Sequence, residues 1–294
     1  MTTSESVHVS VMPNEIVAAV AEVHPMVVVD GTFGGGGHSR LIVEILPAGG
    51  RVIGMDRDPA VSSRYDADPI DPRIDVFIGS YEQTGRALAS LDLPHADAMV
   101  LDLGLSSDQL DDRDRGFSYT ADGPLDLRFD PDNGPTAAQW LSRQDEKTIA
   151  DTIYQFGEER FSRRIARQIV AAARDRDPVR TVDELVTICR RCVPRSKNHD
   201  IHPATRTFQA LRIAVNDELG HLTRTLAAAP DWIRPGGVMA ILSFHSLEDR
   251  IVKHAFRDDD RWDIVTKKPV RPSDREIAVN PRSRSAKLRV ARRR

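Results

Sequence analysis

Short apolar runs alternate along this chain with segments of helical periodicity. Unbroken aliphatic runs are typical of parallel strands that are buried on both faces. The runs predict five strands, at residues 26–29, 51–56, 73–78, 96–104 and 238–242, and two final strands at 262–267 and 287–290. Strands that alternate with helices form a mostly parallel sheet with right-handed crossovers. The pattern therefore predicts an α/β fold.

The alternation stops between about residues 105 and 205. Residues 106–119 are polar, highly charged and without period, and residues 136–192 have mainly helical patterns. A long irregular segment inside a compact chain is usually functional or disordered, and the aromatic residues and glycines of this one argue against simple disorder. We expect a sheet domain made of residues 1–106 and 206–294, and an inserted, mainly helical domain at 107–205.

Acidic and aromatic residues fall at or just after the ends of the predicted strands. Asp30, Asp56 and Asp102 end three strands, and Tyr81 follows another. Ligands of parallel sheets lie at the carboxyl ends of the strands. The glycine cluster Gly34–Gly37 follows Asp30, so the backbone can turn sharply and the next helix can present free N–H groups to a ligand. These features predict a nucleotide-type cofactor site.

The glycine spacing in this loop helps to distinguish the possible cofactors. A dinucleotide fingerprint needs three glycines in the pattern G-x-G-x-x-G, but Ser39 stands where the third should follow Gly34 and Gly36. Asp56 suits the ribose of either cofactor. Asp30, placed before the glycines, resembles the first motif of class I S-adenosylmethionine-dependent methyltransferases. A nicotinamide-dependent oxidoreductase is the main alternative, and a non-catalytic RNA-binding factor is the second.

Composition narrows the class of protein further. The formal net charge is −3, but residues 271–294 carry +7 and the rest −10. A basic tail is a common nucleic-acid footprint, although it can also be a solvated end. No apolar run approaches the roughly 18 residues of a membrane span, and the N-terminus lacks a signal-peptide pattern, so we expect a cytoplasmic protein without membrane contact. Cys189 and Cys192 lie in a helical pattern with no second cysteine pair, so we expect neither a metal site nor redox chemistry.

An ordered set of motifs spans nearly the whole chain and resembles the bacterial 16S ribosomal RNA (cytosine-N4)-methyltransferases of the MraW family. The matching blocks are DGTFGGGGHS (30–39), DRDP (56–59), DLGLSSDQLD (102–111), RGFS (115–118), GEER (157–160), HPATRTFQALRI (202–213), FHSLEDR (244–250) and RSRSAKLR (282–289).

The resemblance implies a class I, Rossmann-like methyltransferase fold with a seven-stranded sheet and an inserted RNA-recognition domain. It implies N4 methylation of a cytosine in the decoding centre of 16S ribosomal RNA, with the small ribosomal subunit as partner, and leaves a homodimer open. The residues implied or proposed to bind S-adenosylmethionine are Asp30, Gly34, Gly36, Gly37, His38, Asp56, Tyr81, Asp102 and Gln109. Tyr81 departs from the phenylalanine of many members, and stacking on the adenine should survive the change.

Methyl transfer to the exocyclic amine of cytosine requires alignment with the methyl group and an acceptor for the amine proton. We therefore expect Asp102 near the methyl and the amine, helped by Asn216 or His245. His245 has an alternative interpretation as a structural histidine.

Overall fold

The computed structural model describes residues 10–120, 122–175, 177–194 and 202–294. Two compact units make up the chain: residues 1–104 with 219–294, and residues 105–218. Within the described residues, every helix is too short or too polar to cross a membrane.

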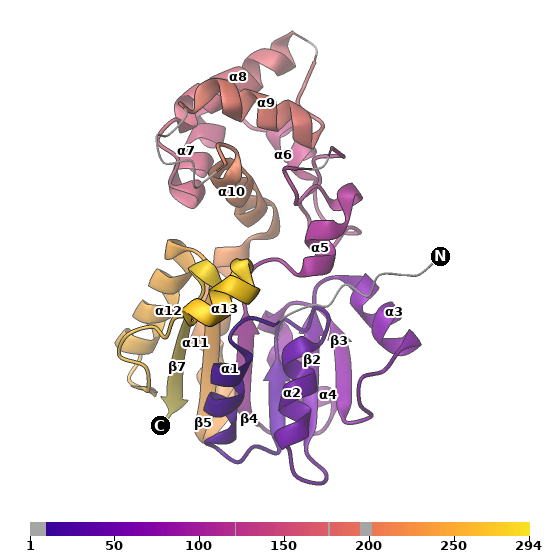
Figure 1. Ribbon diagram of the computed structural model, residues 1–294, viewed down its shortest axis with the longest axis vertical. Helices are drawn as coiled ribbons and strands as arrows, with labels where there is room; N and C mark the ends of the chain where they lie inside the picture. The colour runs from indigo at the N-terminus through magenta and orange to yellow at the C-terminus, as the bar shows by residue number, and fades with distance from the viewer. Residues whose placement is uncertain (1–9, 121, 176, 195–201) are drawn as a thin grey trace. The chain divides into compact units, whose positions relative to one another are not determined.

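The first unit is built on one seven-stranded sheet (Figure 1). Its strands lie in the order β3-β2-β1-β4-β5-β7-β6. Strands β1 to β5 are parallel to one another, whereas β7 runs antiparallel to β5 and β6. The strands are β1 (Val27–Asp30), β2 (Arg51–Asp56), β3 (Ile74–Ile78), β4 (Ala96–Asp102), β5 (Ile233–Ser243), β6 (Trp262–Ile264) and β7 (Lys287–Arg293). The predicted mostly parallel sheet is confirmed, and β1, β2 and β4 end at the expected acids.

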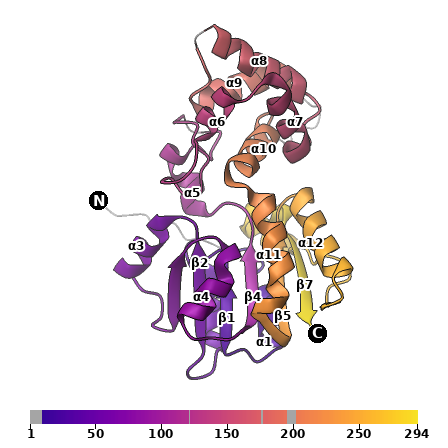
Figure 2. The ribbon, with the colours of Figure 1, turned by 180° about the vertical axis from the view of Figure 1, so that it is seen from behind.

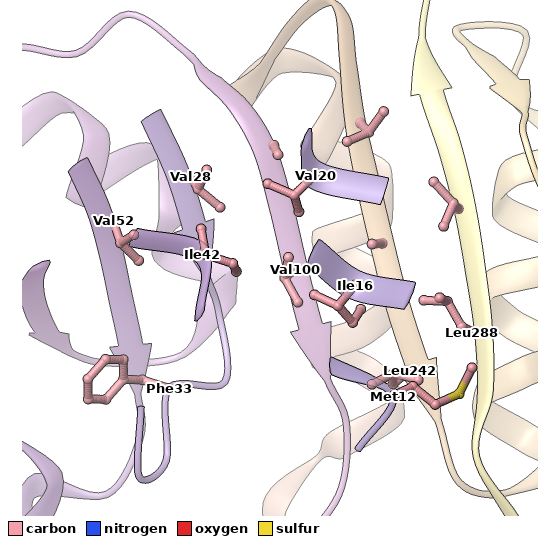
Figure 3. Packing of buried hydrophobic residues seen from close by; sticks show 14 of the residues in the cluster. Met12, Ile16, Val20, Val28, Phe33, Ile42, Val52, Val100, Leu242 and Leu288 are labelled. Carbon is pink, nitrogen blue, oxygen red and sulfur yellow. The ribbon is translucent and has the colours of Figure 1, made fainter. Parts of the chain in front are cut away.

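Consecutive side chains of each strand supply two separate apolar cores, because strand residues alternate between the faces of a sheet. Val28 belongs to one core and its neighbour Val29 to the other, and both are fully buried. Figure 3 shows Val28, Val52 and Val100 against Ile16 and Ile42 of the covering helices. The continuous apolar runs in the sequence therefore indicate a sheet whose two faces are both packed against helices.

The covering helices leave the carboxyl edge of the sheet to the connecting loops (Figure 2). The helices of this unit are α1 (Pro13–Ala21), α2 (Gly37–Ile45), α3 (Pro59–Ala67), α4 (Thr84–Ser90), α11 (Glu218–Trp232), α12 (Ser246–Asp258) and α13 (Asp274–Val279). The short 3-10 turns η1 (Tyr81–Gln83) and η3 (Pro281–Ser285) complete it. Glu218, the first residue of α11, still belongs to the second unit.

The second unit is helical and has its own apolar core. Its elements are α5 (Ser107–Asp111), η2 (Arg113–Arg115), α6 (Ala137–Arg143), α7 (Glu146–Gly157), α8 (Ser162–Arg174), α9 (Val182–Cys192) and α10 (Thr205–Asn216). The capping box read from Thr181 and Glu184 forms at the start of α9. Cys189 and Cys192 are buried on this helix with free thiols.

Helix α10 lies in the helical unit, whereas the sequence analysis placed all of its residues after Thr205 in the sheet domain. Gly157 explains the association, because a Cβ there would lie 2.3 Å from the Arg206 carbonyl oxygen, so only glycine lets α7 and α10 approach so closely. Phe208 and Leu211 of α10 join the helical core. The compact unit thus runs from 105 to 218, thirteen residues beyond the expected boundary at 205.

Candidate cofactor and active site

The loop between β1 and α2 turns back over the end of the neighbouring strand β2. Gly34 and Gly36 have φ of 52° and 71°, the left-handed region that favours glycine. The Gly34 N–H donates to Asp56 Oδ2 at 2.8 Å, and the Phe33 N–H donates to the Met55 carbonyl at 2.9 Å. Gly37 begins α2, which leaves the first N–H groups of that helix directed at the turn. Backbone N–H groups at the start of a helix are suited to binding anions.

The Asp30 side chain holds this loop in place through hydrogen bonds. It is 1% exposed and accepts hydrogen bonds from the Ser39 hydroxyl at 2.7 Å and the Thr32 N–H at 3.2 Å. Ser39, the residue that broke the dinucleotide pattern, is therefore the partner of this acid. Asp30 therefore connects the loop, at Thr32, to Ser39 of α2.

Asp56 has the acceptor capacity that a ribose requires. Its two oxygens accept the Gly34 N–H and the Asp58 N–H, one each. Each carboxylate oxygen carries a second lone pair that can accept a hydroxyl proton. Burial raises the pKa of Asp56, while the two backbone N–H groups lower it. A half-buried carboxylate with free lone pairs at the end of β2 fits the 2′ and 3′ hydroxyls of an adenosyl group.

Tyr81 lies beside the loop, at the start of the turn after β3. A Cβ added to Gly31 would lie 2.8 Å from Tyr81 Cβ and 2.4 Å from Leu101 Cδ2, so glycine at position 31 allows the tyrosine and the strand end to pack together. This packing holds the aromatic ring next to the cofactor loop.

An ion-pair network follows Tyr81, and sequence reasoning missed it. Glu82 accepts two hydrogen bonds from Arg224 of α11 and contacts His221 Nδ1. Ser80 Oγ lies 3.2 Å from the same His221 nitrogen. The hydrogen bond from Arg224 is the main cause that lowers the pKa of Glu82, and burial lowers the pKa of His221. Residues on both sides of Tyr81 are thus anchored to a helix that is 139 or more positions away in sequence, which no local pattern could reveal.

Asp102 and His38 meet at the end of β4. His38 Nδ1 lies 3.6 Å from Asp102 Oδ2, with side-chain exposures of 6% and 20%. The other ring nitrogen, Nε2, lies 2.9 Å from the Val11 carbonyl oxygen. Burial raises the pKa of Asp102 to about 6; His38 opposes that rise, whereas Asp30 and Glu248 add to it. A desolvated carboxylate at this position favours a nearby positive charge, which fits the sulfonium of S-adenosylmethionine.

His245 begins helix α12 after β5. Its Nδ1 accepts the Glu248 N–H at 3.5 Å, while the buried Glu248 carboxylate accepts the Phe244 and His245 N–H groups. His245 Nε2 lies 3.0 Å from Glu248 Oε1, yet the geometry is not that of a hydrogen bond and this buried nitrogen has no other such partner among the described residues. His245 is therefore a helix cap that also carries an unsatisfied ring nitrogen.

Two predicted residues, Gln109 and Asn216, belong to the helical unit. Gln109 closes the capping box of α5, where its Oε1 accepts the Ser106 N–H. Asn216 is 3% exposed and donates to the Leu127 and Arg212 carbonyls, while its Oδ1 accepts the Phe129 N–H at 2.7 Å. Their observed contacts are within that unit, whereas the other predicted site residues belong to the sheet unit.

The basic C-terminal segment is partly neutralised inside the sheet unit. Lys287 and Arg289 of β7 both bind Asp249. The Arg292 and Arg294 guanidinium groups pair with Glu22 and Asp263. Several of the charges that suggested a nucleic-acid footprint therefore stabilise the last strand.

Comparison with known proteins identifies the family. A model of the MraW methylase family matches residues 5–294. The chain belongs to the MraW methylase family. Among curated relatives, a protein named ribosomal RNA small subunit methyltransferase H from Rhodopirellula baltica is 66% identical over 300 residues, covering 99% of this chain and 92% of its own. Proteins of the same name from Sorangium cellulosum and Synechococcus sp. CC9311 are each 48% identical and cover 97% and 98% of this chain and 90% and 93% of their own.

Family membership decides between the alternatives left open by the sequence. The resemblance drawn from the motif blocks is confirmed, as is the Rossmann-like methyltransferase fold. The MraW methylase uses S-adenosylmethionine, so the cofactor prediction is confirmed and the nicotinamide alternative falls away. The activity class is methyl transfer.

Proposed function

We propose that this protein methylates N4 of one cytosine in the decoding centre of 16S ribosomal RNA. The observation that carries the proposal is 66% identity, over 99% of the chain, to a protein named ribosomal RNA small subunit methyltransferase H. The cytosine base and its N4 atom are what the resemblance of the motif blocks implies. The target base lies in folded RNA and must be unstacked to be reached.

Asp102 and His38 supply the acid–base chemistry that an amine acceptor needs. S-adenosylmethionine provides an electrophilic methyl group when it is bound. The new N–CH₃ bond forms as the S–CH₃ bond breaks, and one of the two amine protons must leave. Asp102 Oδ2 accepts the amine hydrogen, which localises the nitrogen lone pair, and takes the proton. A pKa of about 6 leaves this carboxylate mostly ionised at neutral pH but basic enough to hold the proton.

The remaining site residues position the reactants. Asp56 receives the ribose hydroxyls, Tyr81 packs on the adenine, and Asp30 holds the glycine loop through Ser39 and Thr32. His245 is proposed to assist near the acceptor base, and Gln109 and Asn216 act through the segments that they fix in the helical unit. The helical unit is proposed to bind RNA, with exposed arginines of α8 (Arg163, Arg164 and Arg167) as candidate phosphate contacts.

The test is mass spectrometry of 16S RNA nucleosides from cells with and without this gene. Loss of N4-methylated cytidine at one decoding-centre position, restored by the wild-type gene and not by Asp102→Asn, is the expected result. Asp92→Asn is the matched control, because Asp92 is exposed in the same unit at φ 56°, a conformation that asparagine tolerates. An unchanged nucleoside profile would point to a different acceptor.

A further inference from the structure

A cavity of about 300 Å³ lies within the helical unit. All of its lining residues belong to that unit, and none is a residue assigned above to the cofactor or to methyl transfer. Ligand pockets start at about this volume. The space therefore suits one small planar group.

Helix α9 forms one wall of the cavity. Val182, Val186 and Arg190 follow one another at intervals of four residues, so they lie along the same face of the helix. The two valines are buried and the arginine is exposed. Asp183, also exposed, stands next to Val182 at the rim. The wall thus has an apolar floor and a polar edge.

Two stacked aromatic rings also line the cavity. Tyr119 and His202 lie with ring centroids 4.7 Å apart and planes within 7° of parallel. The buried Phe208 contacts Tyr119 edge-on at 6.1 Å, and Arg190 Nη2 lies 3.3 Å from His202 Nε2. Burial, reinforced by the Arg190 charge, lowers the pKa of His202, so its ring stays neutral at physiological pH. A planar ring of a ligand can stack on this pair of aromatic side chains.

Backbone hydrogen bonds hold the rim before any ligand arrives. The Leu125 N–H donates to the Arg180 carbonyl and the Val182 N–H to the Gly123 carbonyl, which ties the segment after Asp122 to the start of α9. Asp122 Oδ1 accepts the Gly123 N–H at 2.9 Å. A preformed site loses less entropy on binding.

The charged side chains at the rim restrict which ligands can enter the cavity. Asp122 and Asp183 disfavour a phosphate, because two carboxylates at the rim outweigh the single guanidinium of Arg190. Carboxylates do accept hydrogen bonds from the exocyclic amines of cytosine, adenine and guanine. Aromatic side chains and arginine planes are the surfaces on which unstacked RNA bases settle.

We propose that this cavity binds one unstacked, amino-bearing nucleobase of the substrate RNA, at a nucleotide other than the one that is methylated. The inference rests on the proposed RNA substrate. It assigns Tyr119 as the stacking surface, Val182 and Val186 as the floor, and Asp183 as an acceptor for the base amine. In this proposal the cavity recognises one base of the RNA, and the sheet unit transfers the methyl group to another.

The test compares Tyr119→Ala with wild type on small ribosomal subunits that lack the modification. Loss of one stacked base should raise the KM for the subunit by roughly 5- to 150-fold, with kcat at saturating subunit and the Kd for S-adenosylmethionine unchanged. Tyr119→Trp should retain most of the affinity. Tyr154→Ala is the control, because Tyr154 is 61% exposed on α7 of the same unit and should change nothing.

Synthetic decoding-centre RNAs with one abasic nucleotide at a time identify the base. At the correct position the abasic change should weaken wild-type binding and add little to the loss already caused by Tyr119→Ala, because the two changes remove the same contact. Additive losses at every position, or a folded Tyr119→Ala with wild-type KM, would overturn the proposal. His202→Gln provides a second variant should Tyr119→Ala fail to fold.

Binding of the same RNAs is also measured without S-adenosylmethionine. These binding constants separate the two proposals: wild-type protein that binds RNA through Tyr119 but methylates none of it supports the cavity and contradicts the proposed acceptor. Binding that is insensitive to Tyr119 and Asp183, with methylation intact, supports the acceptor and contradicts the cavity.

Discussion

His38 Nδ1 lies 3.6 Å from Asp102 Oδ2, while His38 Nε2 lies 2.9 Å from the Val11 carbonyl. A carbonyl oxygen only accepts, so Nε2 must carry the ring proton in the neutral imidazole. In that tautomer the Nδ1 lone pair faces the carboxylate of Asp102. The two side chains therefore meet at the end of β4, where we propose that Asp102 accepts the proton of the target amine.

Binding of S-adenosylmethionine should weaken as the pH falls through about 6. Burial sets the pKa of Asp102 near that value, and the protonated carboxyl no longer attracts the sulfonium charge. Isothermal titration from pH 5 to 8 should show this dependence for S-adenosylmethionine and a weaker one for S-adenosylhomocysteine, whose sulfur is neutral. Asp102→Asn should remove the difference and Asp92→Asn should keep it. Equal slopes for the two ligands would contradict the assignment.

Asp102 should also make the ligand-free protein less stable as the pH rises. Its folded pKa of about 6 lies above the unfolded value of 3.8, so its stabilising contribution is complete below about pH 4 and is lost as the pH rises through 6. The difference in unfolding free energy is up to about 3 kcal/mol. Urea unfolding of the wild type and Asp102→Asn at pH 4.5 and 7.5 measures it, and parallel behaviour of the two proteins would exclude it.

Glu82→Gln should loosen the segment that carries Tyr81. The pKa of Glu82 is lowered, first by its hydrogen bond from Arg224, so the stabilisation is present above the unfolded pKa of 4.5 and disappears as the pH falls through the lower folded value. We expect a loss of about 1 kcal/mol at pH 7, because the pair is partly exposed, and weaker S-adenosylmethionine binding. Asp258→Asn, which breaks an exposed pair with Arg257 in the same unit, should leave that binding unchanged.

Asn216→Ala should destabilise the helical unit by about 2 kcal/mol or more. The change leaves the Leu127 carbonyl and the Phe129 N–H without their buried partner. Thermal unfolding measures the loss, and Asn133→Ala, at an exposed asparagine of the same unit, is the control. A variant of unchanged stability that had lost methyl transfer would instead assign Asn216 a direct catalytic role.

Neither cysteine should react in the folded protein. Burial raises the pKa of Cys189 to about 12 and raises that of Cys192 as well, and the thiolate is the reactive form. An Ellman titration at pH 8 should detect almost no thiol until denaturant is added, and then two. Rapid reaction without denaturant would reopen a redox role for the pair.

The sequence predicted those features that depend on local pattern. Apolar runs located the strands, and Asp30, Asp56 and Asp102 appeared at strand ends because the carboxyl edge of a parallel sheet gathers them. The capping box of Thr181 and Glu184 could be predicted for the same reason, since its two residues are three positions apart.

Contacts across long separations could not be predicted in this way. The His221 contact with Glu82 joins residues 139 positions apart, and nothing in either neighbourhood indicates it. The place of α10 depends on the close approach of Arg206 to Gly157, which is a property of packing and leaves only an isolated glycine in the sequence. The hydrogen bonds of Asp30 with the Ser39 hydroxyl and the Thr32 N–H likewise could not be read from the motif that placed this acid before the glycines.

Strands β4 and β5 are hydrogen-bonded neighbours, yet β4 ends at Asp102 and β5 begins at Ile233. During synthesis, the edge of β4 that pairs with β5 stays uncovered while residues 103–232 are translated. This takes roughly 6 to 26 seconds at ordinary elongation rates. An uncovered strand edge is a template for wrong pairing. We expect the contiguous helical unit to fold during that interval, so the nascent chain completes this unit before β5 can close the sheet beside Asp102.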